Sequence, residues 1–259
     1  SLNTLVNRDR QSSINKYLDS IKLGASSSIY LQVTGTPQAL LLQTIASGWH
    51  PYFTYYFQPG DAYLGGDFFF PNDKPECIVF NDNLKDPTLT VVIRHLASSA
   101  QILASGCKVS NCLIHPSVRQ AVHEKFAKEV RQKLQWCIDN IDGALDALIR
   151  SEYDNLFPQR FDKLGVDALV GAVKKILISN TIKVIVMNGK TDVDNSEYEE
   201  GCNFVIGGNT LGRGVTFPRL QTIYYTRTSK KPQADTMWQH SRMFGYDRDP
   251  GLMRVFIDE

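Results

Sequence analysis

The chain has 259 residues, a formal net charge of +1 from 28 Lys and Arg against 27 Asp and Glu, and no acidic tail or basic arm. This length can bury a sizeable core, as one large domain or one and a half smaller ones. The balanced charge excludes a whole-surface field for nucleic acid, so any such contact must be local.

The cysteines bear on metal binding and on the cellular compartment. The five cysteines are scattered, and the sequence has no CxxC pair, which argues against a zinc site. Without a signal peptide or a long apolar run, we expect free, buried thiols in a cytoplasmic protein that has no membrane segment.

The first fifty residues predict a helix, a strand and a second helix. Asn3–Ile21 has apolar residues at helical spacing, which predicts an amphipathic helix closed by Gly24. Ser28–Val33 predicts a strand. This strand leads through the turn Thr34-Gly35-Thr36-Pro37 into a helix over Gln38–Ala46.

The stretch from Trp49 to Phe70 is dense in aromatic residues. Single-stranded nucleic acid stacks on such side chains, but a binding surface of this kind also needs interleaved Lys or Arg. The stretch has none. We therefore predict that it packs in a crossover between two domains.

Strands and helices alternate through the rest of the chain. This alternation implies an α/β fold with a mostly parallel sheet. Helices are predicted over Leu89–Ala104, Val118–Asp139, Asp142–Arg150 and Val166–Ile178, and strands over Val109–His115, Ile182–Met187, Phe204–Ile206, Leu220–Thr226 and Met253–Ile257.

The most informative stretch runs from Phe204 to Arg248. Its first strand ends in Gly207-Gly208, the pattern of a buried strand that enters a tight loop. The loop Asn209–Gly214 carries Arg213 between two glycines, which lets backbone and guanidinium approach a ligand closely. Asp235–Phe244 predicts a helix that presents Gln239 and Arg242 near its end.

This order of elements resembles motifs V and VI in the second RecA-like lobe of superfamily 2 helicases. GGNTLGRGVTFPRL followed by DTMWQHSRMFGYDRD resembles more closely the Z1 domain, a helicase-type module found in ATP-dependent restriction systems. The resemblance covers Phe204–Arg248 tightly and the rest of the chain loosely. The turn at Thr34-Gly35-Thr36 resembles motif III, which links the ATP site to the nucleic-acid groove.

The resemblance implies a mostly parallel RecA-like sheet flanked by helices, with a helical insertion. Residues 1–48 would be the end of a first RecA-like lobe, residues 49–105 a crossover and helical segment, and residues 106–259 the second lobe. It also implies that the sequence is a piece of a longer polypeptide. In Z1-type proteins the acidic motif lies just upstream of a stretch like Ser1–Thr4.

The chemistry of ATP hydrolysis requires a phosphate cradle and a metal-holding carboxylate. Neither GxxxxGK[ST] nor an Asp-Glu pair after a strand is found in the sequence. By the resemblance, ATP lies between two lobes, and arginines near the carboxyl ends of the second sheet reach its phosphates. Arg242 is the first candidate for this arginine finger, Arg248 is the second, and Gln239 orients the motif. Arg242 lies three residues after Gln239 rather than the usual four, which leaves the choice between the arginines open.

Further site residues follow from the same resemblance. The turn Thr34, Gly35 and Thr36 would couple ATP to nucleic acid. For the glycines, a tight turn needed only for folding is the alternative, and for the arginines it is a surface ion pair with Asp235, Asp247 or Asp249. The residues that would line the nucleotide cleft and touch the DNA backbone are Gly207, Gly208, Asn209, Arg213, Gly214 and Thr216, the last at the position of a ribose-contacting Asp in many helicases.

The sequence therefore predicts the C-terminal half of a superfamily 2 DNA-dependent ATPase or translocase, the motor part of an ATP-dependent restriction endonuclease. Its partners would be DNA, the first RecA-like lobe of the same polypeptide and a nuclease domain or subunit, since the chain has no nuclease motif. ATP and Mg²⁺ would bind the complete protein, with no metal site and no tightly bound nucleotide in this chain. Two alternatives stay open: a helicase-like scaffold without ATP chemistry, and a nucleotide-binding transferase that uses GGNTLGRG as its phosphate loop.

Overall fold

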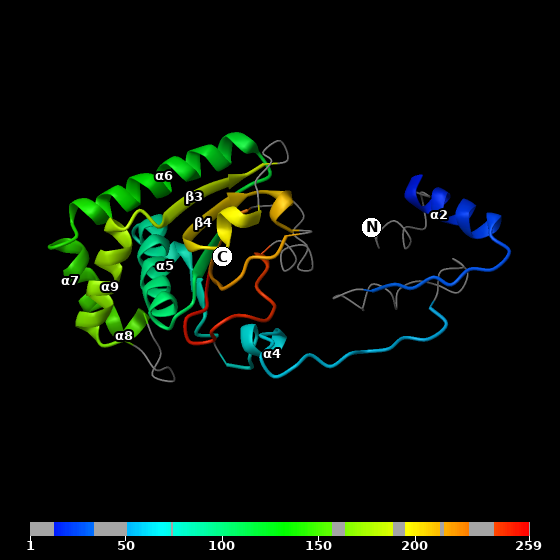
Figure 1. Cartoon of the computed structure of the whole chain (residues 1–259), viewed down its shortest axis with the longest axis horizontal. Helices are drawn as coiled ribbons and strands as arrows, with labels where there is room; N and C mark the ends of the chain where they lie inside the picture. Colours follow the sequence, from blue (N-terminus) through cyan, green and yellow to red (C-terminus); the bar gives the residue numbers. More distant parts are fainter. Residues whose placement is uncertain are drawn as a thin grey trace. The chain divides into compact units, whose positions relative to one another are not determined.

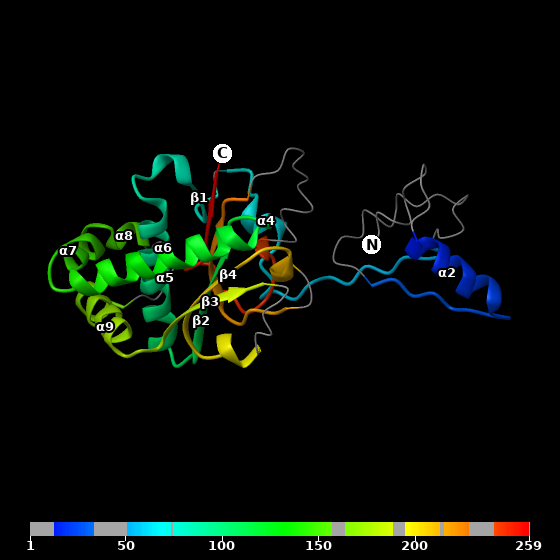
Figure 2. The ribbon, with the colours of Figure 1, turned by 90° about the horizontal axis from the view of Figure 1, so that it is seen from above.

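The computed structural model describes residues 13–33, 51–73, 75–156, 164–188, 195–212, 215–227 and 241–258. The chain divides into two compact units, Ser1–Pro59 and Gly60–Glu259. The second unit holds the sheet and the helices that flank it (Figures 1 and 2). No helix among these described ranges is long and apolar enough to cross a membrane.

The described part of the first unit contains one helix and extended chain. Helix α2 spans Ser13–Gly24 and ends at the glycine that the sequence predicted as its terminus. The strand predicted over residues 28–33 is wrong, because these residues pair with no other strand in the described parts and Ile29 is 99% exposed. The aromatic side chains of Tyr52 to Phe57 are exposed as well. Their packing in a crossover between two domains stays a prediction.

The second unit is built on one sheet of six strands, in the order β1-β6-β5-β2-β4-β3. Every pairing between these strands is parallel. The predicted α/β class with a parallel sheet flanked by helices is confirmed, and the architecture is consistent with a RecA-like fold. The strands are β1 (Ile78–Phe80), β2 (Val109–His115), β3 (Ile182–Met187), β4 (Gly201–Gly207), β5 (Leu220–Tyr225) and β6 (Arg254–Ile257).

Helices cover one face of this sheet (Figure 2). α5 begins two residues before the predicted start, because Pro87 suits the first helical position and the Asp86 carboxylate accepts the N–H of Leu89 at 3.0 Å. The helices are α4 (Gly66–Phe69), α5 (Pro87–Ala104), α6 (Gln120–Asp139), α7 (Ala144–Ser151), α8 (Tyr153–Leu156) and α9 (Val166–Ile178), with 3-10 turns η2 (Asn81–Asn83), η3 (Asn195–Tyr198) and η4 (Asn209–Gly212).

Two hydrophobic clusters lie on opposite faces of the sheet because successive strand residues point to opposite sides. Cys112 and Phe204 face α5, α6 and α9 in the first cluster. Leu113 and Val205 face α4 and the loops in the second. All five cysteines are free, and four of them are buried, as the sequence predicted.

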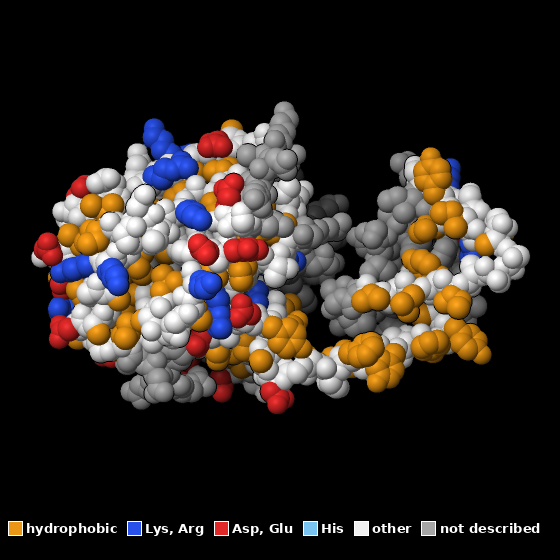
Figure 3. Space-filling model, in the orientation of Figure 1, with side chains coloured by type: hydrophobic (Ala, Val, Ile, Leu, Met, Phe, Trp, Pro, Cys, Tyr) orange, Lys and Arg blue, Asp and Glu red, His pale blue; other side chains and the backbone are white. Residues whose placement is uncertain are grey.

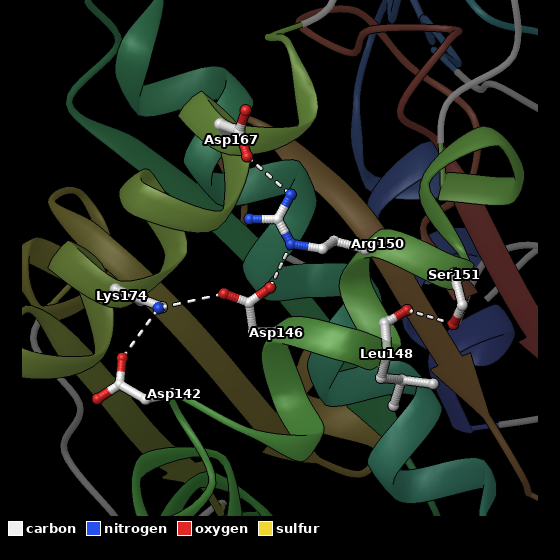
Figure 4. Close-up of polar contacts among 7 residues, drawn as sticks. All are labelled: Asp142, Asp146, Leu148, Arg150, Ser151, Asp167 and Lys174. Carbon is white, nitrogen blue, oxygen red and sulfur yellow. Dashed lines mark hydrogen bonds and ion pairs between the residues drawn. The ribbon is translucent and has the colours of Figure 1, made fainter.

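Ion pairs join α7 to its neighbours on the surface (Figure 4). Arg150 binds Asp146 one turn back along α7 and reaches Asp167 in α9 at 2.7 Å. Lys174 of α9 binds Asp142 at 2.9 Å and Asp146 at 3.2 Å. The Arg150 hydrogen bond holds the pKa of Asp146 below its usual value. Such exposed pairs align α7 with α9 and contribute little to stability.

The carboxylates and ammonium groups are mixed over the face of the second unit in Figure 3. Lys and Arg side chains lie among Asp and Glu side chains on this face, without a large area of one sign. This distribution agrees with the near-zero net charge, and on this face it leaves local contacts as the means of binding an anion.

The buried imidazole of His95 makes the fold sensitive to acid. His95 lies in α5 with no exposed surface, packs edge-on against the Phe204 ring at 4.8 Å and lies 3.4 Å from the Ser99 hydroxyl. Burial lowers the pKa of His95 from 6.5 to about 3. The unfolded chain therefore binds one more proton than the folded chain between these pH values, and stability falls as the pH drops below 6.5.

We expect the His95→Leu variant to lose this part of the acid sensitivity. Between pH 7.5 and pH 5 the free energy of unfolding of the unchanged protein should fall by about 2 kcal/mol more than that of the variant. Urea unfolding at both pH values measures the difference. An equal loss in both proteins would contradict the assignment of this proton uptake to His95.

Candidate functional site

The chain order of the sheet makes the carboxyl ends of β2 and β5 a topological switch point. These strands are neighbours, yet the chain leaves β2 toward β3 on one side and leaves β5 toward β6 on the other. In open α/β sheets, ligands bind where neighbouring connections diverge in this way. The segments that follow β2, β3, β4 and β5 therefore frame the candidate site.

His123 in the first turn of α6 joins two of these segments. Its Nε2–H donates to the Ser117 carbonyl at 2.7 Å, and its Nδ1 lies 2.6 Å from Asn188 Oδ1. Ser117 follows β2, and Asn188 directly follows β3. With only 2% of its surface exposed, the ring acts as a link between loop ends.

Gly207 and Gly208 at the end of β4 pack against the same segments. A Cβ on Gly207 would lie 2.7 Å from the Met187 carbonyl oxygen, and one on Gly208 would lie 3.0 Å from the Ser117 carbonyl oxygen and 3.1 Å from the His123 ring. Both glycines are buried. Their lack of a side chain thus serves close packing of β4 against β3 and β2, the folding alternative that the sequence left open.

Polar groups at this carboxyl edge of the sheet remain accessible. Arg227 follows β5, and its Nη1–H donates to Asn209 Oδ1, after β4, at 3.0 Å. Thr216 is exposed, as are Asn209 and Arg119, the residue before α6. Arg227, Arg119 and the first-turn N–H groups of α6 form the positive part of this edge.

Arg242 and Arg248 lie in the loop 241–249. This loop packs against the sheet through Met243, which belongs to the second hydrophobic cluster. The predicted helix does not reach Phe244, because Arg242 is already left-handed, with a φ of 56°. The guanidinium of Arg248 folds back onto this loop. Its Nη2 donates to the Arg242 carbonyl at 2.7 Å and its Nη1 to the Tyr246 carbonyl at 2.6 Å.

The residues on either side of Arg248 are tied to the amino end of β5. Asp247 binds the Arg219 guanidinium at 2.9 Å and accepts the Arg219 backbone N–H at 2.9 Å, directly before β5. The Asp249 N–H donates to Gln221 Oε1 at 3.1 Å. This anchoring of the loop differs from the expectation that Arg242 and Arg248 lie near the carboxyl ends of the strands.

The guanidinium of Arg242 differs from that of Arg248. Among the described residues, none forms a hydrogen bond or ion pair with it, so the alternative of an ion pair to Asp247 or Asp249 is not realised. Arg242 is half-buried, and burial lowers its pKa. Burial and the neighbouring charge of Arg242 lower the pKa of Arg248 to about 10, so Arg248 stays positive at neutral pH.

A short segment at the start of the second unit binds the same loop. Leu64 and Gly245 exchange backbone hydrogen bonds of 2.9 and 3.1 Å. The Gly60 N–H donates to Tyr246 Oη at 2.9 Å, and the Tyr63 ring lies 5.1 Å from that of Tyr246. The loop 241–249, called the arginine loop below, is therefore held by the Arg248 side chain and by residues 60–64.

Several predicted site residues lie outside the described residues. These are Thr34, Gly35 and Thr36 of the turn, Arg213 and Gly214 of the glycine loop, and Gln239, together with Asp235 of the alternative ion pairs.

The chain belongs to the Z1 domain family, whose model matches residues 83–259. The match takes in α5 and five of the six strands, leaving only β1 of the sheet outside it. No curated protein and no solved structure matches the chain.

Sequence reasoning missed the residues that connect the strand ends. It gave no role to His123, which joins Ser117 and Asn188. It also gave no role to Arg227. The available signal was position: Ser117, Asn188, Asn209 and Arg227 all follow predicted parallel strands, and such ends share one edge of a sheet.

We expect the Gly207→Ala variant to be less stable by about 1–3 kcal/mol, since the added methyl overlaps the Met187 carbonyl and the surrounding backbone must shift. Gly171→Ala in the middle of α9 is the matched control. Its Cβ would meet nothing within 4 Å, so it should stabilise the protein by roughly 0.5–1 kcal/mol. Chemical denaturation of both variants measures this, and a neutral Gly207→Ala would show that the packing at β4 is not needed.

Proposed function

We propose that this chain is the second RecA-like lobe of a superfamily 2 DNA-dependent ATPase or translocase. In this proposal it is the motor part of an ATP-dependent restriction endonuclease. Membership of the Z1 family and the parallel sheet with diverging connections support it. The first RecA-like lobe of the same polypeptide would supply the phosphate cradle and the carboxylate for Mg²⁺. Cleavage of DNA would belong to a nuclease domain or subunit.

The observation that carries the proposal is the backbone conformation of Arg242 together with the surroundings of its guanidinium. A left-handed backbone costs a residue other than glycine about 1–2 kcal/mol, and such strain gathers at functional sites. Arg242 combines this backbone with a half-buried guanidinium that no described residue binds. A cation that no described residue binds is suited to an anionic ligand. We assign it the role of arginine finger, which stabilises the charge on a phosphoryl group during transfer.

The carboxyl edge is suited to a second anionic ligand, the DNA backbone. Arg119, Arg227 and the start of α6 offer charged and N–H donors of the kind that bind phosphate oxygens. Contacts of this kind give affinity that falls with salt and depends little on sequence. Asn209 and Thr216 remain candidates for the same edge, since both are exposed.

Replacing Arg242 tests the finger. In the complete polypeptide, Arg242→Ala should lower the kcat of DNA-stimulated ATP hydrolysis by roughly 10³-fold or more, while DNA binding is retained. Arg131→Ala is the matched control, because Arg131 is exposed on α6 and, among the described residues, donates to the Val184 carbonyl alone. Steady-state ATPase assays and DNA gel shifts measure both effects. Unchanged turnover in Arg242→Ala would favour the scaffold alternative.

Nucleotide binding by the separate chain distinguishes the transferase alternative. We expect no measurable heat when ATP and Mg²⁺ are titrated into this chain alone, because the proposal places the phosphate cradle in the first lobe. The packing of Gly207 and Gly208 against protein atoms agrees with this expectation. Binding in the micromolar range by calorimetry would instead support GGNTLGRG as a phosphate loop.

A further inference from the structure

Arg242 needs support from its surroundings to keep its conformation. Left-handed backbone at a residue other than glycine is populated only where neighbouring contacts hold it. The carbonyl of Arg242 accepts a hydrogen bond from Arg248 Nη2 at 2.7 Å. This bond fixes the peptide plane directly after Arg242, and with it the direction in which the residue presents its side chain.

The guanidinium of Arg248 fits closely into the loop that it holds. Its second donor, Nη1, binds the Tyr246 carbonyl at 2.6 Å, so one planar group bridges two carbonyls four residues apart. Gly245, with a φ of 151°, leaves room for it: a Cβ there would lie 2.5 Å from Nη1. A guanidinium has the fork of donors that this bridge needs, whereas an ammonium is a single point.

The two arginines therefore do different work. We propose that Arg248 is a positioning residue that acts through Arg242, by holding the Arg242 carbonyl and so the direction of the finger. This inference rests on the proposed ATPase function. It separates the two arginines that the sequence could not rank. Arg248 donates two hydrogen bonds to carbonyls of the loop, whereas the Arg242 guanidinium donates none to a described residue.

A double-mutant cycle in the complete polypeptide tests this role. The variants are Arg242→Ala, Arg248→Ala and the double variant, with kcat and KM for ATP measured in the presence of DNA. Arg248→Ala should lower kcat by roughly 10–100-fold, as expected for a displaced catalytic group, with little change in KM. The double variant should be no slower than Arg242→Ala alone, because Arg248 has no other route to the reaction.

The variant Arg248→Lys guards against a failure of Arg248→Ala to fold. The lysine keeps the charge but cannot bridge both carbonyls. It should show the same loss of kcat as Arg248→Ala. Arg131→Ala, which also removes an arginine bound to a backbone carbonyl, should keep the full rate.

Each contrary result has a distinct meaning. A double variant that is slower than Arg242→Ala by the full Arg248→Ala factor would make Arg248 an independent contact and overturn the inference. A normal rate in Arg248→Lys, or in folded Arg248→Ala protein, would overturn it too. Absence of DNA-stimulated hydrolysis in the unchanged protein would overturn the proposed function itself, and the inference with it.

Discussion

The carboxyl edge of the sheet depends on the close approach of β4 to its neighbours. Gly207 leaves no space for a methyl group beside the Met187 carbonyl, and Gly208 leaves little beside Ser117 and His123. The imidazole completes this junction by binding Ser117 and the residue after β3. Strand ends whose backbones pack without intervening side chains are fixed in position relative to one another. The loops that leave β2, β3 and β4 therefore start from one rigid base.

The arginine loop depends on a different set of contacts. It is tied to the amino end of β5 through the pair of Asp247 with Arg219, and it is buried through Met243. Residues 60–64 add two backbone hydrogen bonds at Gly245 and one to the hydroxyl of Tyr246. A loop held at so many points can keep a strained residue, because relaxing it would break several bonds at once.

Much of the fold could be read from the sequence, and the exceptions have physical causes. Val109–His115, Ile182–Met187 and Val166–Ile178 were predicted with their observed limits, since apolar runs and helical spacing reflect the face that each element buries. Ser28–Val33 has the same apolar composition but no partner strand among the described residues. The composition of a segment indicates its tendency to adopt an extended backbone, whereas a strand in a sheet also needs a neighbouring strand to pair with.

The site was less predictable, because the spacing of residues in a sequence does not show where their side chains point. The sequence placed Arg242 and Arg248 six residues apart and gave both the same candidate role. The structure directs one guanidinium back onto its own loop and leaves the other without a bond to any described residue. The signal that separates them is Gly245, whose missing side chain admits the Arg248 fork. Its meaning appears only when the loop is folded.

The proposed roles of Arg242 and Arg248 also have an electrostatic basis. Two guanidiniums close enough to lower the pKa of Arg248 repel each other, so neither would be directed toward the other without fixed acceptors. Carbonyl oxygens bind Arg248 Nη1 and Nη2 without cancelling the charge of the guanidinium, because they carry only partial negative charge. The positive field near Arg242 is thereby kept. In a partly buried position, where water screens less, such a field attracts an anion more strongly than a single exposed arginine would.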